Sequence, residues 1–343
     1  MTRPLGRLCI AGELLMILAL GSGCAARRST KLHDFTTSPY FDEQVKTYVF
    51  DPNVTVHINA PSAAVYDPDL PTRVVVYALP NGNTIAQTIG CEKEPDLDWH
   101  FYIQHIGAQT RRLRELLSDT NLVVAYVEAG GRSWPNWRQK TADSGARLVA
   151  LVDSVRAHFP GDRTTVELTC HSGGGSLIFG YIDQVEQIPD WIERIVFLDA
   201  NYGYSDQEQH AEKLLTWLQR SPRHYLGVVA YDDRNIEVDG KKVVGPTGGT
   251  YRKTQAMVAR ISHDLPLSED KLPDRTVWKA LDGRLDIELF ENPANKILHT
   301  VLVERNGFLH ALTFGTPAAE RAGRLFDAPT YAAWIQSGSA LPE

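Results

Sequence analysis

The residues most able to do chemistry lie at 169–175, which read Thr-Cys-His-Ser-Gly-Gly-Gly. This segment directly follows a strand predicted over 165–169 and directly precedes a helical stretch. A serine on such a sharp turn projects above the sheet at a helix N-terminus, where backbone N–H groups stabilise an oxyanion. The positions two places on either side must be small. Gly174 meets this condition, and Cys170 stands where the common G-x-S-x-G pattern has glycine. The pattern predicts Ser172 as the nucleophile of an acyl-transfer reaction.

With this H-S-G-G turn, the chain resembles the α/β-hydrolase superfamily, and it is most similar to bacterial exported members. The resemblance covers roughly residues 70 to 315 in the order of elements and is most specific at the nucleophile. It implies a Ser-His-Asp triad whose members follow in the chain order nucleophile, acid, histidine.

The resemblance implies His310 as the general base. His310 ends the turn Asn-Gly-Phe-Leu-His, just beyond a strand predicted over 300–303, where the family keeps its catalytic histidine. A neutral imidazole can take the serine proton and later return it to the leaving group. His299 is the rival, but it precedes that predicted strand and is expected at the opposite edge of the sheet. His171, beside the nucleophile, is expected to pack within the turn.

Two aspartates compete for the position of the acid. Asp199 follows a strand predicted over 194–198, and Asp232 follows the next one along the chain. Both are expected at the carboxyl edge of the sheet, where a carboxylate can orient the histidine. Most family members place the acid after the later strand, which favours Asp232, although Arg234 is close enough to form a local ion pair with it. Asp199 has no basic neighbour in the sequence and is slightly favoured as the acid, and both aspartates remain candidates.

The oxyanion donors are expected on two loops. The resemblance places the first donor in the loop after the third strand, here the Pro-Asn-Gly-Asn turn, which points to Asn81 and Gly82. The second donor is expected to be the backbone N–H of Gly173. The alternative for Asn81-Gly82 is an ordinary surface turn. Trp134 and Trp137 are expected either to wall the substrate cleft or to pack within the fold.

The elements that must position these residues follow an α/β pattern. Strands alternate with helices of ten or more residues, which predicts a mostly parallel, doubly wound sheet with helices on both faces. Strands are predicted at 54–58, 73–79, 122–127, 165–169, 194–198, 225–231 and 300–303. Helices are predicted at 102–117, 142–158, 174–185, 207–219 and 253–261. Residues 233–296 break the alternation and are expected to form an insertion or a small cap.

The N-terminal residues 1–24 resemble the signal of a bacterial lipoprotein. Arg3 and Arg7 precede a short apolar run over 14–20, which is too brief to span a bilayer. Small residues then lead to Cys24, the expected lipidation site, and a plain secretory signal is the alternative. The segment predicts an exported protein, either a lipoprotein that contacts the membrane through this anchor or a periplasmic or secreted protein.

The composition is that of a globular protein with one large domain. The chain has 343 residues, 43% of them hydrophobic, and a formal net charge of -7, so it offers no basic face for nucleic acid. Residues 25–45 are expected to be a tether and 46–343 the hydrolase domain. Cys91 and Cys170 are expected to be two buried thiols, with a single bridge between them as the alternative. No spacing typical of a metal or nucleotide site is present, so neither a metal nor a cofactor is predicted.

Two hypotheses about function follow. In the first, the protein is a serine hydrolase that cleaves an ester, or an amide, of a small molecule or of the cell envelope through an acyl-enzyme. In the second, it is an inactive envelope lipoprotein that keeps the hydrolase scaffold for binding or structure. The geometry separates them, because an enzyme requires a histidine beside Ser172 with an aspartate behind the imidazole.

Overall fold

The computed structural model describes Met1, residues 29–339 and Leu341. The predicted signal segment and Cys24 therefore lie outside the described residues. Among the helices of the described part of the chain, none combines the length and apolarity that a membrane crossing needs.

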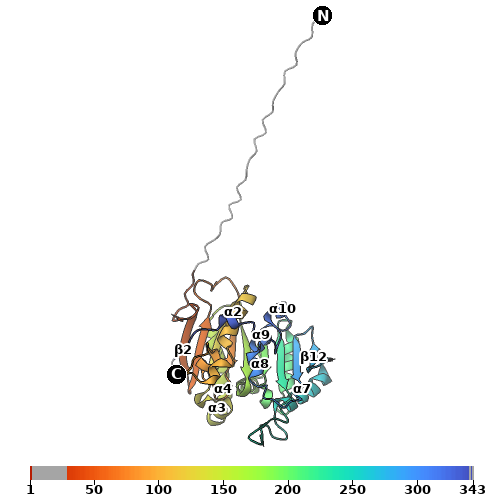
Figure 1. Ribbon diagram of the computed structural model, residues 1–343. Helices are drawn as coiled ribbons and strands as arrows, with labels where there is room; N and C mark the ends of the chain where they lie inside the picture. Colours follow the sequence, from red (N-terminus) through yellow and green to blue (C-terminus); the bar gives the residue numbers. More distant parts are fainter. Residues whose placement is uncertain (2–28, 340, 342–343) are drawn as a thin grey trace.

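An eleven-stranded sheet forms the centre of the described structure (Figure 1). The strands lie in the order β1-β2-β3-β5-β4-β6-β7-β8-β13-β12-β11. Within the run β5-β4-β6-β7-β8-β13 the strands pair with one another in parallel. The pairs toward both edges are antiparallel. The strands of the sheet are β1 (Thr36–Thr37), β2 (Gln44–Phe50), β3 (Val54–Ala60), β4 (Thr72–Ala78), β5 (Asn121–Glu128), β6 (Thr164–His171), β7 (Ile192–Leu198), β8 (Tyr225–Tyr231), β11 (Ser268–Lys271), β12 (Arg275–Ala280) and β13 (Leu285–Phe290). A separate hairpin consists of β9 (Glu237–Val238) and β10 (Lys241–Lys242).

The central strands are buried along nearly their whole length, because both of their faces are covered. In β5 every residue except the last is buried, and β4 and β6 are each buried except at their second position. Such continuous runs are typical of parallel strands with helices on both sides. The predicted fold class, a mostly parallel doubly wound sheet, is therefore confirmed.

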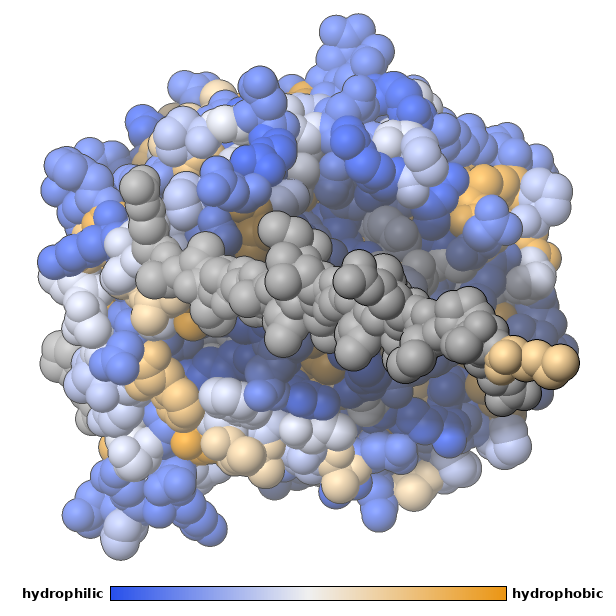
Figure 2. Space-filling model, turned by 90° about the horizontal axis from the view of Figure 1, so that it is seen from above, coloured by the Kyte–Doolittle hydropathy of each residue, from blue (hydrophilic) through white to orange (hydrophobic). Residues whose placement is uncertain are grey.

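Helices cover both faces of the sheet, and each layer has its own apolar core (Figure 1). One layer contains α3 (Trp134–Lys140), α4 (Ser144–Ala157), α5 (Gly175–Gln184), α6 (His210–Arg220) and α7 (Thr250–Asp264). The other contains α1 (Ile85–Ile89), α2 (Ile106–Leu116), α8 (Val301–Glu304), α9 (Gly307–Thr313) and α10 (Ala319–Ala322). Short 3-10 helices are η1 (Trp99–Tyr102), η2 (Gly130–Arg132), η3 (Ser172–Gly174), η4 (Asn201–Gly203) and η5 (Ala332–Trp334). The face of the molecule in Figure 2 is mostly hydrophilic with scattered apolar residues, as expected when the apolar side chains are inside.

The strand predicted over 300–303 is wrong, and the last parallel strand of the sheet is therefore a different one. The apolar residues 301–303 of this predicted strand belong to the helix α8, and Thr300 directly precedes it. A run of three apolar residues satisfies a strand and a helix equally well, and here the preceding turn continues into helix. The six other predicted strands are present as β3 to β8.

The last parallel strand is β13, within the segment expected to be an insertion or cap. Residues 233–296 contain β9 to β13 and α7, and β11 to β13 extend the main sheet. All six residues of β13 are buried, including Asp286 and Glu288. Asp286 is paired with Lys279 at 3.3 Å and Glu288 with Arg275 at 2.7 Å, so β13 carries buried charge that its partners on β12 balance.

The predicted tether over 25–45 is also wrong in its second half. Thr36 of β1 pairs with Val45 of β2 at the edge of the sheet, and Phe35 is buried in the core. The polar composition of this segment hid the strands because edge strands pair through their backbones and leave one face in water.

Candidate active site

The turn between β6 and α5 holds Ser172 in a strained backbone conformation. The φ of Ser172 is 54°, in the left-handed region that residues other than glycine seldom occupy. Strand β6 ends at His171, and the chain passes through η3 into α5. A Cβ on Gly174 would collide with the carbonyl of Ala78, and one on Gly175 with the carbonyl of Ala200. The glycines are therefore required by the close approach of the turn to the ends of β4 and β7.

The next strand along the sheet, β7, places Asp199 at the same edge. Asp199 is fully buried and has a φ of 44°. Its Oδ2 accepts a hydrogen bond from Nδ1 of His299 at 2.5 Å, and its Oδ1 accepts one from the hydroxyl of Thr250. Because a carboxylate only accepts, His299 carries its proton on Nδ1, which leaves Nε2 as the basic nitrogen.

His299 reaches this edge from the loop that follows β13. Its ring is 24% exposed, and it lies against the ring of His171 with a centroid distance of 4.4 Å. Nε2 of His171 also lies 3.0 Å from the carbonyl oxygen of His299. Since His171 directly precedes Ser172, the structure brings the turn of Ser172, His299 and Asp199 together at one edge of the sheet.

Asp232 lies in a local ion pair away from the histidine. Its carboxylate accepts hydrogen bonds from the Arg234 guanidinium at 2.7 and 2.8 Å, and this pairing lowers the pKa of Asp232. The neighbouring Asp233 is buried and accepts the N–H of Thr250 at 2.8 Å, and burial, followed by the charge of Asp199, raises its pKa. Of the two candidate acids, the structure therefore places Asp199 behind a histidine and Asp232 beside an arginine.

His310 is not brought to Ser172 and requires a correction. It lies on α9, with its Nε2 3.1 Å from Oε1 of Glu288 in the middle of β13. The expectation depended on a strand over 300–303. With β13 as the last parallel strand, the first histidine that follows it is His299, the rival candidate. The alternation of Leu285, Ile287 and Leu289 was the signal that could have identified β13 from the sequence.

The pairing of His310 predicts a pH-dependent contribution to stability. Burial alone would lower the pKa of His310, but the charges of Glu288 and Asp286 outweigh it and raise the pKa above its usual value. A raised folded-state pKa gives stability that is complete below the unfolded pKa of about 6.5 and is lost as the pH rises through the folded value. We expect His310→Gln to lower the free energy of unfolding by about 2 kcal/mol at pH 5.5, with a smaller difference at pH 9. Urea unfolding at both pH values checks this, and a difference independent of pH would contradict it.

The two expected oxyanion loops meet at Asn81. A Cβ built on Gly173 would collide with the side-chain amide of Asn81, so these two residues are direct neighbours. The N–H of Gly82 donates to the carbonyl of Arg132 at 2.9 Å and is therefore not available for an oxyanion. Gly173 and Asn81 therefore remain candidate donors to an oxyanion, whereas Gly82 does not.

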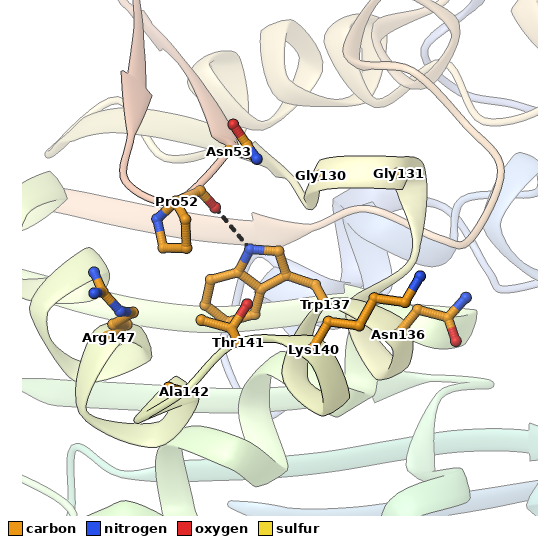
Figure 3. A pocket seen from close by; sticks show the side chains of 10 residues that line it. All are labelled: Pro52, Asn53, Gly130, Gly131, Asn136, Trp137, Lys140, Thr141, Ala142 and Arg147. Atoms are coloured by element: carbon orange, nitrogen blue, oxygen red, sulfur yellow. Dashed lines mark hydrogen bonds between the residues drawn. The ribbon is translucent and has the colours of Figure 1, made fainter.

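Trp134 and Trp137 pack within the fold. Trp134 is 1% exposed and Trp137 6%, and their rings meet edge to face at 5.6 Å. The indole N–H of Trp137 donates to the carbonyl of Pro52 at 2.8 Å (Figure 3). A cavity of about 410 Å³ lies beside Trp137, and its lining residues are Pro52, Asn53, Gly130, Gly131, Asn136, Trp137, Lys140, Thr141, Ala142 and Arg147. Since this lining includes none of Ser172, Asp199 and His299, the cavity is separate from the site at the strand ends.

The described residues offer little metal chemistry. Within them, no group of three or more histidine, cysteine, aspartate or glutamate side chains could hold a metal ion. Cys91 and Cys170 are both free and buried, in different apolar clusters, so they form no bridge.

Three features together identify the fold type. They are a central parallel sheet in this strand order, a serine with left-handed backbone at a strand–turn–helix, and a histidine after the last parallel strand. The chain has the α/β-hydrolase fold. It matches no protein-family model and no curated protein. Among solved structures it is similar to a thermostable esterase, with a TM-score of 0.42 and 14% identity over 76% of this chain and 56% of that chain.

Two further solved structures are similar at comparable levels. Esterase 2 of Thermogutta terrifontis gives a TM-score of 0.37 and 12% identity over 72% of this chain and 83% of that chain. Poly(aspartic acid) hydrolase-1 from Sphingomonas sp. KT-1 gives a TM-score of 0.40 and 15% identity over 64% of this chain and 86% of that chain. The chain spans little more than half the length of the thermostable esterase.

Proposed function

We propose that the protein is a serine hydrolase that cleaves an ester by acyl transfer to water. The observation that carries the proposal is the 2.5 Å hydrogen bond between His299 and the buried Asp199, beside the left-handed turn of Ser172. A carboxylate on Nδ1 holds the imidazole in the tautomer whose Nε2 is a base, and it stabilises the imidazolium that forms. Asp199 has its second oxygen bonded to Thr250, so the carboxylate is fixed on both sides.

In the first half-reaction, Oγ of Ser172 attacks the carbonyl carbon of the ester while His299 Nε2 takes the hydroxyl proton. The N–H of Gly173 and a donor from Asn81 stabilise the negative charge on the carbonyl oxygen. The tetrahedral intermediate then breaks its bond to the leaving oxygen, which receives the proton from His299. The products are an alcohol and an acyl group on Ser172.

In the second half-reaction, water attacks the acyl carbon and gives its proton to His299. The bond to Oγ of Ser172 breaks, Oγ takes that proton back, and the carboxylic acid is released. We favour an ester over an amide as the substrate because an alkoxide is the easier leaving group.

The proposal is tested by treating the full-length protein with a fluorophosphonate, which reacts with an activated serine. We expect one adduct per chain, located on Ser172 by mass spectrometry of peptides, and a parallel loss of hydrolysis of p-nitrophenyl acetate. A p-nitroanilide of the same acyl group serves as the matched amide substrate. Folded protein that acquires no adduct, or an adduct at another residue, contradicts the proposal and favours a hydrolase scaffold that only binds.

A further inference from the structure

The loop that carries His299 is irregular and is held mainly near its two ends, where Asn292 donates to the carbonyl of Asp232 at 2.9 Å and Leu298 accepts from the N–H of Leu302 at 2.9 Å. It runs from 291 to 300, between the end of β13 and the start of α8, without a strand or helix. Asn292 shapes its beginning through two hydrogen bonds with the backbone of Lys296, at 2.9 and 3.0 Å. At its end, the backbone of Leu298 and His299 lies near the side chain of Tyr231. The hydrogen bond to Asp199 orients the imidazole ring of His299. The backbone of His299 must be held by other contacts.

One of those contacts comes from the residue next to the nucleophile. Nε2 of His171 lies 3.0 Å from the carbonyl oxygen of His299. A carbonyl only accepts, so His171 carries its proton on Nε2 and donates it. The two imidazole rings also touch, with an interplanar angle of 37°. A single side chain thus joins the turn of Ser172 to the backbone of the residue that acts on Ser172.

The burial of His171 argues that this hydrogen bond is why a histidine is present. His171 is 1% exposed, and its Nδ1 has no hydrogen-bond partner among the described residues. A buried nitrogen without a partner destabilises a fold, so an apolar ring would fill the same space at lower cost. Burial, and then the neighbouring His299, hold the pKa of His171 well below its ordinary value, so the ring is neutral and does not compete as a base.

We propose that His171 is a positioning residue, whose Nε2–H fixes the backbone of His299 so that the catalytic imidazole faces Ser172. This inference rests on the proposed function for its catalytic consequence. It makes a structural claim as well, because removing the donor frees the loop 291–300 whether or not the protein is an enzyme.

The test compares His171→Phe, which keeps a ring and removes the donor, with His171→Gln, whose amide nitrogen takes the place of Nε2. We expect His171→Phe to lower kcat about a hundredfold through misplacement of the base, with KM and the melting temperature little changed, and His171→Gln to restore most of kcat. Hydrogen exchange measured by mass spectrometry should be faster over 291–300 in His171→Phe than in the wild type or in His171→Gln. A purely structural role would change stability without this separation of kcat from KM and without rescue by glutamine.

Equal kcat and equal exchange in the wild type and His171→Phe would overturn the proposal, as would an equal loss in both variants. If His171→Phe does not fold, His171→Asn replaces it, because the asparagine amide is too short to reach the carbonyl of His299. A failure of the proposed function is distinguishable. The protein would then take no fluorophosphonate label, while the difference in exchange over 291–300 would still support or overturn the role of His171.

Discussion

Replacing His299 with alanine should lower kcat for p-nitrophenyl acetate by roughly 10⁶-fold, a loss comparable to that of Ser172→Ala. Without the base, the hydroxyl of Ser172 remains a weak nucleophile and no group returns a proton to the leaving oxygen. Both residues act in the same steps, so the double variant should lose no more than either single one. Steady-state rates of ester hydrolysis, together with the rate of fluorophosphonate labelling, measure the effect.

The matched control is His310→Ala, which removes another histidine of the same domain. His310 is bonded to Glu288 on β13, so we expect this variant to keep the labelling rate and kcat of the wild type at a temperature where it is folded. Because its ion pair is lost, its free energy of unfolding should fall. A variant His299→Ala that still labels at Ser172, or a variant His310→Ala that folds and does not label, would show that the base is assigned to the wrong histidine.

The strand–turn–helix geometry around Ser172 could be predicted from the sequence because its determinants are local. A buried strand, a serine, and glycines at the start of a helix occupy consecutive positions, and each has a direct structural reason. Gly174 and Gly175 are required by the carbonyl of Ala78 at the end of β4 and that of Ala200 just after β7, which are distant in sequence. The small size of the two glycines is nevertheless visible in the sequence itself.

The histidine could not be predicted as securely because its position depends on which strand is last. β13 alternates apolar residues with Asp286 and Glu288, whereas its parallel neighbour β8 carries no charged residue. Its carboxylates are buried only because Arg275, Lys279 and His310 neutralise them, and these partners come from other elements. The sequence shows the alternation of Leu285, Ile287 and Leu289 but not these tertiary ion pairs, so the short apolar run over 300–303 is the more evident strand candidate.

The sequence leaves two aspartates as candidates for the acid, and only their tertiary contacts distinguish them. The proximity of Arg234 to Asp232 was evident in the sequence, and the structure pairs them. The bond between Asp199 and His299 spans 100 residues and depends on a loop whose course only the folded chain determines.

Asp199→Asn should lower kcat by about 10⁴-fold, the effect typical of a triad whose aspartate becomes an amide. An asparagine can present its NH₂ group to His299, which then accepts on Nδ1 and carries its proton on Nε2, where it cannot act as a base. The lost negative charge also no longer stabilises the imidazolium in the transition state. The measurement is kcat across pH 6 to 9 for this variant beside Asp232→Asn.

Asp232→Asn is the matched control because it makes the same change after the adjacent strand. Its carboxylate contacts Arg234 and not the histidine, so only a partly exposed ion pair is lost and kcat should stay at the wild-type level. Equal losses in the two variants would indicate that the carboxyl edge as a whole is disturbed, and a larger loss in Asp232→Asn would reassign the acid. A loss of kcat confined to Asp199→Asn would show that catalysis requires the carboxylate behind His299. The substitution preserves the size of a fully buried side chain and changes only its charge and its hydrogen-bonding pattern.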